Sequence, residues 1–313
     1  QYNSGKDEPK TRWSGIHPLW RYHKYIGYGD YINKYGKPKD VADFAKKAQL
    51  VNYNQYRALI EGFSSHMWDW YTGVIIWKTQ NPWTAMRGQM YDHFLDQNAG
   101  LFGLHHAGEA LHILFDPVKE QVMITNNTFE DKNDLIIKVF CYDIQGNESL
   151  IYQESVSVNA TSAQEFGIIG SKLSPLKSEK GIFLLLKLMD KNQKLLSENL
   201  YWLPDKNGGY SGLKEIKSVT MEASVEKVDQ QHLSLKLRNP SSKNPVSFFN
   251  RISVINKKTN KRVLPVFYSD NYISIVPGEV KTIRIDLSAI SNRNNLKVRL
   301  SGWNTKTIEI NID

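Results

Sequence analysis

The chain has 313 residues, enough for two or three domains at roughly 100–200 residues each. Hydrophobic residues make up 41% and charged residues 23%, values typical of a globular protein. The formal net charge of +8 comes from scattered lysines, which argues against a nucleic-acid-binding groove. No apolar run reaches the ~18 residues of a membrane span, so none is predicted. The single cysteine, Cys141, excludes an intramolecular disulfide and is typical of a small buried hydrophobe.

The first region, up to about residue 107, has the pattern of helices and one buried strand. Asp40 follows a turn and can cap a helix from Val41 to about Gly62, whose apolar residues recur at i, i+3 and i+4. Gly73–Trp77 is a continuous apolar run of strand length, as in a parallel sheet buried on both faces. A loop containing Pro82 follows, and then a predicted helix near Ala85–Leu95.

The second region changes to alternating apolar and polar residues, which is typical of half-buried strands. Turn-forming residues separate the segments. The predicted strands are Gln121–Thr125, Asp134–Tyr142, Ser149–Val158 and Gly181–Met189. Short strands at this spacing indicate an immunoglobulin-like sandwich.

Asp205–Gly209 is predicted to be a linker, and a second β-rich region follows it. Eight short strands in about 100 residues fit a second sandwich. They are Val219–Val228, His232–Arg238, Phe248–Asn256, Val263–Tyr268, Tyr272–Val276, Lys281–Leu287, Lys297–Gly302 and Thr307–Ile312.

The first region is too short to be a whole domain of the kind it suggests, because a (β/α)₈ barrel takes about 250 residues. The sequence therefore predicts a multidomain chain of α/β plus all-β class. Residues 1–107 are the last part of a (β/α)₈ TIM barrel, with its eighth strand near 73–77. Residues 108–208 form an immunoglobulin-like β-sandwich, and residues 209–313 form a second β-sandwich.

In such a barrel the active site lies at the carboxyl ends of the strands, where Trp77 is placed. An indole packs well against the C–H face of a sugar and can also donate a hydrogen bond, so Trp77 is a candidate platform for a sugar ring. Asn81 and Trp83 follow in the loop and are candidates for the rim of the pocket. From spacing alone, Trp77 could equally be core, and Asn81 and Trp83 ordinary turn residues.

Hydrolysis of a glycosidic bond needs two carboxylic acids. None of the acidic residues of the first region ends a buried strand: Glu8, Asp30, Glu61, Asp69, Asp92 and Asp96. Glu61 and Asp92 fall on predicted helices, where carboxylates usually face solvent. We therefore assign no catalytic residue to this chain.

A metal site could be considered for four neighbouring side chains, His105, His106, Glu109 and His112. Zinc-binding helices place ligands at i and i+4, a spacing that is met here only in part. Gly103 and Gly108 also argue against a regular helix in this stretch. The sequence predicts no metal and no cofactor.

The stretch Gly73–Trp83 resembles a strand and loop of glycoside hydrolase family 2, most like its exo-β-D-glucosaminidase branch, with β-mannosidases close by. Further matching segments occur in order along the chain: Tyr91–Leu95, Gly100–Gly103, Ala107–His112, Ser197–Leu203, Val263–Tyr272 and Val276–Glu279. Ala110 stands where the family usually has proline.

The resemblance implies a five-domain retaining exo-glycosidase that hydrolyses terminal β-linked hexosamine or hexose residues. Its nucleophile and its acid would precede Gln1, so this part alone would be inactive. Trp77 matches the strand-eight tryptophan that floors the −1 sugar site, and Asn81 and Trp83 match loop residues near the pocket. The implied partners are a carbohydrate and the upstream part of the same enzyme. Residues beyond 107 would be scaffold.

Two alternatives remain open from the sequence. One is a stand-alone carbohydrate-binding or adhesion module of β-sandwich type, and the other is a pseudoenzyme. The run 73–77 favours the enzyme, because a binding module has no use for a single parallel strand without sheet partners. The Lys- and Asn-rich composition leads us to expect a periplasmic or secreted bacterial protein. The chain begins at Gln1 without Met, so we expect it to be cut from something longer.

Overall fold

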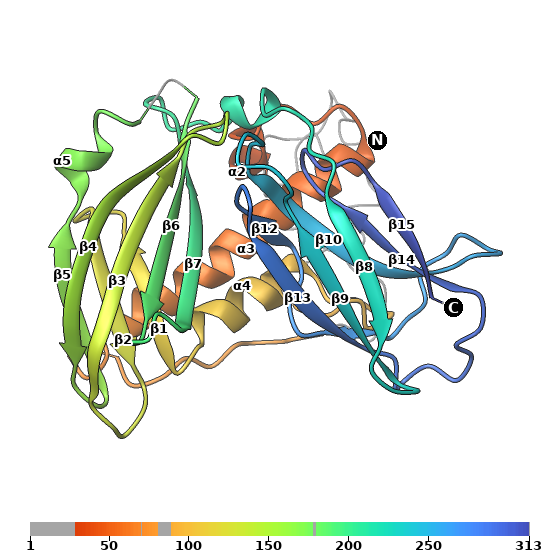
Figure 1. Ribbon diagram of the computed structural model, residues 1–313, viewed down its shortest axis with the longest axis horizontal. Coiled ribbons are helices and arrows are strands. Elements are labelled where there is room, and N and C mark those ends of the chain that lie inside the picture. The colour runs from red at the N-terminus through yellow and green to blue at the C-terminus, as the bar shows by residue number, and fades with distance from the viewer. Residues whose placement is uncertain (1–28, 70, 81–88, 178–179, 313) are drawn as a thin grey trace, which may run out of the picture.

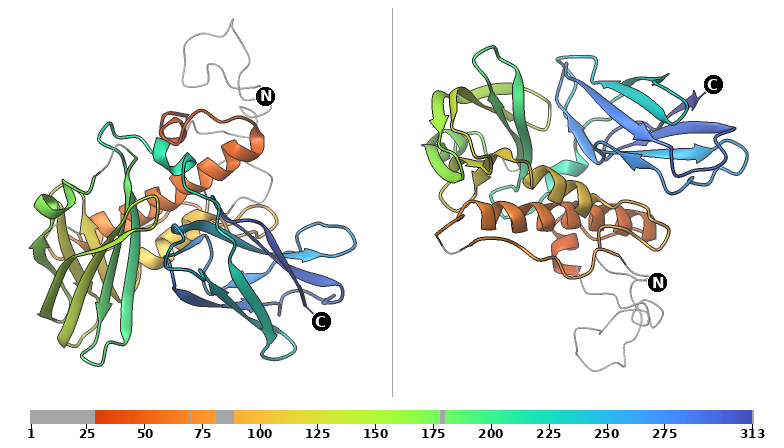
Figure 2. Two further views of the ribbon diagram at one scale, coloured as in Figure 1. Left: turned by 45° about the horizontal axis from the view of Figure 1, so that its top comes forward. Right: turned by 90° about the horizontal axis from the view of Figure 1, so that it is seen from below.

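The structure, a computed structural model, describes residues 29–69, 71–80, 89–177 and 180–312. It consists mostly of β-sheets with few helices. Two β-structured bodies stand side by side, and a long helix crosses behind them (Figure 1). Seen from below, both bodies lie on one side of a helical layer (Figure 2, right).

Among the described residues, the helical layer contains three helices: α2 (Gly29–Asn33), α3 (Val41–Ser64) and α4 (Ala99–Ala107). The predicted start of α3 is confirmed, because the side chain of Asp40 accepts the backbone N–H of Asp43 at 2.8 Å. The helix continues slightly beyond Gly62, and the N–H of Ser65 closes it on the carbonyl of Glu61 at 3.0 Å.

Gly103 and Gly108 do not prevent a regular helix in this stretch, contrary to our expectation from the sequence. Gly103 lies inside the helix, and Gly108 caps its end. A methyl group on Gly103 would come within 2.3 Å of the carbonyl oxygen of Tyr53 on α3. The glycine is therefore present because the two helices pack closely, not because the helix is irregular.

Two predictions fall in the segment between α3 and α4. Residues 73–77 form an extended segment without a ladder to any strand that the structure describes, so the eighth barrel strand expected there stays a prediction. The apolar run has strand composition, but a strand also needs a neighbouring strand to pair with. The helix near Ala85–Leu95 is not formed over residues 89–95, which make a bridge at Tyr91 and a tight turn; residues 85–88 lie outside the described part.

The first sandwich packs a sheet of order β1-β2-β5 against a sheet of order β4-β3-β6-β7. Its elements are β1 (Leu111–Asp116), β2 (Gln121–Asn126), β3 (Lys132–Tyr142), β4 (Glu148–Val158), β5 (Ser162–Ile168), the short helix α5 (Gly170–Leu173), β6 (Ile182–Met189) and β7 (Leu195–Leu203). All four strands predicted here are confirmed. Strands β1, β5 and β7 were not among the four, and β5 is an edge strand without a buried residue.

The second sandwich has two four-stranded sheets, β12-β10-β14-β15 and β11-β13-β9-β8. A short 3₁₀-helix, Ser211–Lys214, leads into β8 (Glu222–Lys227), β9 (His232–Arg238), β10 (Ser247–Asn256), β11 (Phe267–Tyr268), β12 (Ile273–Ile275), β13 (Val280–Asp286), β14 (Leu296–Ser301) and β15 (Ile308–Ile312). All eight predicted strands are present, although β11 is much shorter than expected. The expected linker is an ordered turn, in which Asp205 Oδ1 accepts the N–H groups of Asn207 and Gly209.

A third core lies where the helical layer meets both sandwiches, in addition to the core inside each sandwich. Tyr53 of α3, Trp202 of β7 and Phe249 of β10 meet there, with ring centroids 5.7–6.0 Å apart. Because each ring comes from a different body, this core fixes the three bodies relative to one another.

Candidate functional site

The predicted sugar platform, Trp77, lies on the extended segment between α3 and α4. Its side chain is 85% exposed, and Ile75 on the same segment is 97% exposed. The segment runs along the side of the helical layer away from the sandwiches (Figure 2, right). Asn81 and Trp83 lie outside the described residues, so the structure places only one of the three predicted site residues.

Behind Trp77 the chain doubles back on itself. The carbonyl of Thr79 accepts the N–H groups of Met90 and Tyr91, both at 3.1 Å. Tyr91 also forms bridges to Gln80 on one side and to Gln97 on the other. We call these three short segments, at residues 79–80, 90–92 and 96–97, the loop base; its first segment follows closely after Trp77.

This loop base is joined to the second sandwich through Asp96. Arg251 Nη2 lies 2.6 Å from Asp96 Oδ2, and Arg262 Nη1 contacts the same oxygen. Arg251 also lies over the ring of Tyr272, 5.7 Å from its centroid. The sequence made Asp96 a possible catalytic acid, but its carboxylate holds two arginines instead.

Glu61 is the clearest departure from the sequence-based expectation of a solvated carboxylate. It is buried, and its Oε1 accepts from His112 Nε2 at 3.1 Å and from Asn199 Nδ2 at 2.6 Å. Burial acts to raise its pKa, but the His112 hydrogen bond and the charge of Arg57 outweigh burial and lower it. On the other side of the imidazole, the Glu109 carboxylate lies 3.5 Å from His112 Nδ1. This cluster joins α3 to strands β1 and β7.

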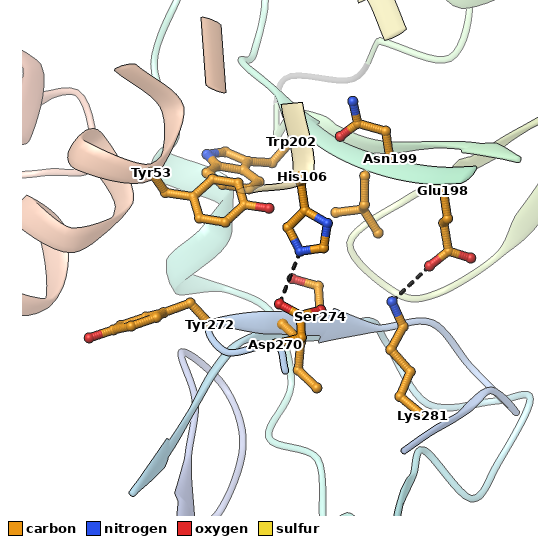
Figure 3. Close-up of a pocket in the computed structure, with 11 residues that line it drawn as sticks. Tyr53, His106, Glu198, Asn199, Trp202, Asp270, Tyr272, Ser274 and Lys281 are labelled. Carbon is orange, nitrogen blue, oxygen red and sulfur yellow. Dashed lines mark hydrogen bonds and ion pairs between the residues drawn. The ribbon is translucent and has the colours of Figure 1, made fainter. Parts of the chain in front are cut away.

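A small cavity of about 40 Å³ lies where the three bodies meet (Figure 3). In it, His106 of α4 points toward the second sandwich and contacts Asp270 Oδ1 at 3.0 Å. Burial acts to lower the pKa of His106, but Tyr53, Asp270 and Glu109 outweigh burial and raise the pKa well above its usual value.

Across the same cavity, a second ion pair joins the two sandwiches. Lys281 Nζ of β13 lies 2.7 Å from Glu198 Oε1 of β7 (Figure 3). Lys187 Nζ lies 3.2 Å from Glu198 Oε2. Burial opposes ionisation of Glu198, but the two lysines lower its pKa to about 2. The cavity is therefore lined by paired charges that connect bodies.

A larger groove of about 630 Å³ runs between α3 and the first sandwich. Aromatic side chains line its walls, including Phe115, Tyr201 and Tyr210. Arg57 also lines the groove, with its guanidinium 4.1 Å from the centroid of the Tyr201 ring. The guanidinium donates to the carbonyl of Leu200 at 2.7 Å, so Arg57 connects α3 to β7 beside this groove.

Within residues 29–69, 71–80, 89–177 and 180–312, no group of three or more His, Cys, Asp or Glu side chains is arranged to hold a metal ion. Two of the three histidines weighed as metal ligands, His106 and His112, have carboxylate partners. Over the same residues, none of the helices combines the length and the apolar character needed to cross a membrane.

Sequence reasoning missed most of these charged contacts, because their partners are distant in the chain. Ser197 and Asn199 gave no local signal either: they alternate with Leu196 and Leu200, a pattern that predicts solvent-facing polar side chains, yet both are buried. Ser197 Oγ donates to Glu109, and Asn199 reaches Glu61. No signal marked Arg251 as the partner of Asp96.

Comparison with known proteins gives a consistent result. Residues 199–305 match the profile of a family described as the exo-beta-D-glucosaminidase Ig-fold domain. The chain is 35% identical to mannosylglycoprotein endo-beta-mannosidase of Lilium longiflorum, over 92% of this chain and 37% of the relative. It is 29% identical to exo-beta-D-glucosaminidase of Amycolatopsis orientalis, over 91% of this chain and 30% of the relative.

Solved structures agree. The chain superposes on the exo-chitosanase CsxA of Amycolatopsis orientalis with a TM-score of 0.81 and 27% identity, covering 97% of this chain and 38% of that one. A beta-D-mannosidase from Dictyoglomus thermophilum shares the fold, with a TM-score of 0.69 at 16% identity over 88% of this chain and 32% of that one. The chain spans about a third of the length of the curated relatives it matches. It is therefore a homologue of the C-terminal part of exo-β-D-glucosaminidases and of a mannosylglycoprotein endo-β-mannosidase.

Proposed function

We propose that this chain is the C-terminal part of a retaining exo-β-glycosidase of glycoside hydrolase family 2, which hydrolyses terminal β-linked hexosamine or hexose residues. The observation that carries the proposal is the match of nearly the whole chain to the C-terminal part of an exo-chitosanase, at a TM-score of 0.81. In this proposal residues 1–107 end a (β/α)₈ barrel, and residues 108–208 and 209–313 are two sandwiches that support it.

The exposure of the segment 73–77 supports the barrel. Ile75 is 97% exposed and Trp77 is 85% exposed, although both belong to an apolar run. Contiguous apolar side chains in water are unfavourable, so such a segment marks a place that another part of the protein covers. Residues 73–77 would pair with the seventh barrel strand on one side and with the first on the other, both supplied by the upstream part of the enzyme.

Trp77 is then placed at the carboxyl end of the eighth strand, where barrel enzymes bind substrate. Its indole would stack on the face of the terminal sugar, and Asn81 and Trp83 would complete the rim of the pocket. This role is proposed from the resemblance and from the exposure of Trp77.

Retaining hydrolysis requires one carboxyl group as nucleophile and another as acid and then base, about 5 Å apart. Two carboxylates of the first region already have other partners: Glu61 is hydrogen-bonded inside the protein, and Asp96 holds two arginines. The family resemblance implies that both catalytic acids lie in the preceding part of the barrel, and this chain alone would then be inactive. Its own part would be to supply the sugar platform and to fix the barrel's last helices.

The test is to purify the protein from its source, measure its intact mass and map its N-terminal peptides. We expect a mass well above the 36.0 kDa of this chain. The purified protein should release p-nitrophenol from a β-D-glucosaminide or a β-D-mannoside, and NMR should show the β-anomer of the sugar first. The isolated chain should release none.

Two results would contradict the proposal. A mature product of 36.0 kDa that begins at Gln1 would favour the stand-alone binding module. A longer protein whose Trp77→Ala variant keeps full activity would remove Trp77 from the sugar site. Trp68→Ala is the matched control, because Trp68 is also exposed, at 59%, but donates to the carbonyl of Thr161 in the first sandwich.

A further inference from the structure

The carboxylate of Asp96 is an ionic connection between the loop behind Trp77 and the second sandwich. It is 15% exposed and is shared by Arg251 of β10 and by Arg262, which follows β10. Hydrogen bonds between ionised groups are stronger than neutral ones. Because both arginines contact the same carboxylate, its loss would remove two such bonds at once.

Asp96 is tightly coupled to the base of the loop. Its carbonyl accepts the N–H of Asp92 at 3.1 Å, and its own N–H donates to Asp92 Oδ1 at 3.0 Å. Tyr91, next to Asp92, bridges to Gln80, and Gln80 follows Trp77 closely in the chain. A displacement of Asp96 would therefore be transmitted to the backbone beside Trp77.

We propose that Asp96, Arg251 and Arg262 form an ionic clamp through which the C-terminal sandwich positions Trp77 for the sugar, so that Asp96 is a positioning residue of the reaction. The inference rests on the proposed function, because it requires Trp77 to contact the substrate. Binding groups must be held accurately, since a misplacement of about 1 Å can cost on the order of 10²-fold in rate.

The clamp is not needed merely to attach the second sandwich to the helical layer. His106 of α4 contacts Asp270 at 3.0 Å, and Lys46 of α3 donates to the carbonyl of Gly302 at 2.8 Å. These contacts, with the shared aromatic core, would keep the sandwich in place without Asp96. The effect of losing the carboxylate should fall on the loop.

The test compares Asp96→Asn, Trp77→Ala and the double variant in the full-length enzyme that contains this chain. Glu309→Gln is the matched control, because Glu309 also binds two cations, Lys297 and Arg299 at 2.6 Å each, but only within the second sandwich. Asp96→Asn should lower kcat/KM about tenfold, and Glu309→Gln should leave it unchanged. The double variant should be no worse than Trp77→Ala, because Asp96 acts through Trp77.

If kcat/KM of the double variant falls by the product of the two single losses, Asp96 acts independently of Trp77, and the clamp is overturned. An Asp96→Asn variant that behaves like Glu309→Gln would overturn it too. Amide hydrogen exchange on the isolated chain separates failure of the clamp from failure of the proposed function. The N–H groups of Met90 and Tyr91, which donate to Thr79, should exchange faster in Asp96→Asn than in Glu309→Gln. Equal exchange would refute the clamp whatever the enzyme's activity.

Discussion

His112 Nε2 lies 3.1 Å from Glu61 Oε1, so one fully buried imidazole of strand β1 is paired with a buried carboxylate of helix α3. Such a pair does not by itself add much stability, because both groups lose their hydration. Its value here is that it fixes the orientation of the first sandwich on the helical layer. Removing one partner leaves the other charge buried and unpaired.

Glu61→Ala should therefore lower the free energy of unfolding by about 3–5 kcal/mol. Urea denaturation of the isolated chain measures it. The control is Glu222→Ala, which breaks an exposed pair with Arg238 at 3.5 Å and should cost about 0–1 kcal/mol. Similar losses in the two variants would mean that the Glu61 cluster does not hold α3 to the sandwich.

Stability should also depend on pH in a defined way. The pKa of Glu109 is lowered to about 2, because hydrogen bonds from His106, His112 and Ser197 outweigh the opposing effect of burial. Its contribution is present above its unfolded pKa of about 4.3 and is lost as pH falls below it.

The pKa values of His106 and His112 are raised by their carboxylate partners against the effect of burial. Their contribution is complete below the unfolded pKa of about 6.5 and is lost as pH rises through the folded values. Thermal unfolding between pH 3 and pH 9 should therefore give the highest midpoint at about pH 5–6. A midpoint that keeps rising up to pH 9 would contradict the assignment.

The close packing of α3 on α4 can be tested with two glycines of the same layer. Gly103→Ala should destabilise the chain by about 1–3 kcal/mol, because the methyl group would meet the Tyr53 carbonyl at 2.3 Å. Gly62→Ala, with nothing within 4 Å, should be neutral or stabilising by about 0.5–1 kcal/mol. Chemical denaturation of both variants decides it, and a stabilised Gly103→Ala would refute the close approach.

The exposed apolar segment predicts an unusual response to substitution. Ile75→Ser and Trp77→Ser should leave the stability of the isolated chain within about 0.5 kcal/mol of the original. They should also reduce self-association, measured by sedimentation, because the largest exposed apolar side chains of the segment are gone. A loss of about 2 kcal/mol or more in either variant would show that the isolated chain buries the segment.

The β-strands were predictable because their signal is local. Alternation along His232–Arg238 gives the bounds of β9 without reference to any other part of the chain. The run 73–77 has the same composition as a buried strand, but whether it forms one depends on neighbours that composition does not contain.

Side-chain partners depend even more on distant parts of the chain. Glu61 is separated from His112 by 51 positions and from Asn199 by 138, and Asp96 from Arg251 by 155. Helical periodicity could place Glu61 on one face of α3. It could not reveal that a histidine and an asparagine from the first sandwich would cover that face. Only the family pattern marked a candidate site residue, Trp77, and its role stays a prediction.

The aromatic core shared by Tyr53, Trp202 and Phe249 affects how the molecule comes apart. Each body contributes to this core an aromatic side chain that it could not bury alone. Cutting the chain at the Asp205–Gly209 turn would therefore leave both pieces with solvent-exposed aromatic side chains. The two sandwiches should therefore melt together in a single transition and should be poor candidates for recombination as separate modules. The interfaces between the bodies therefore belong to the folding unit as much as the sheets do.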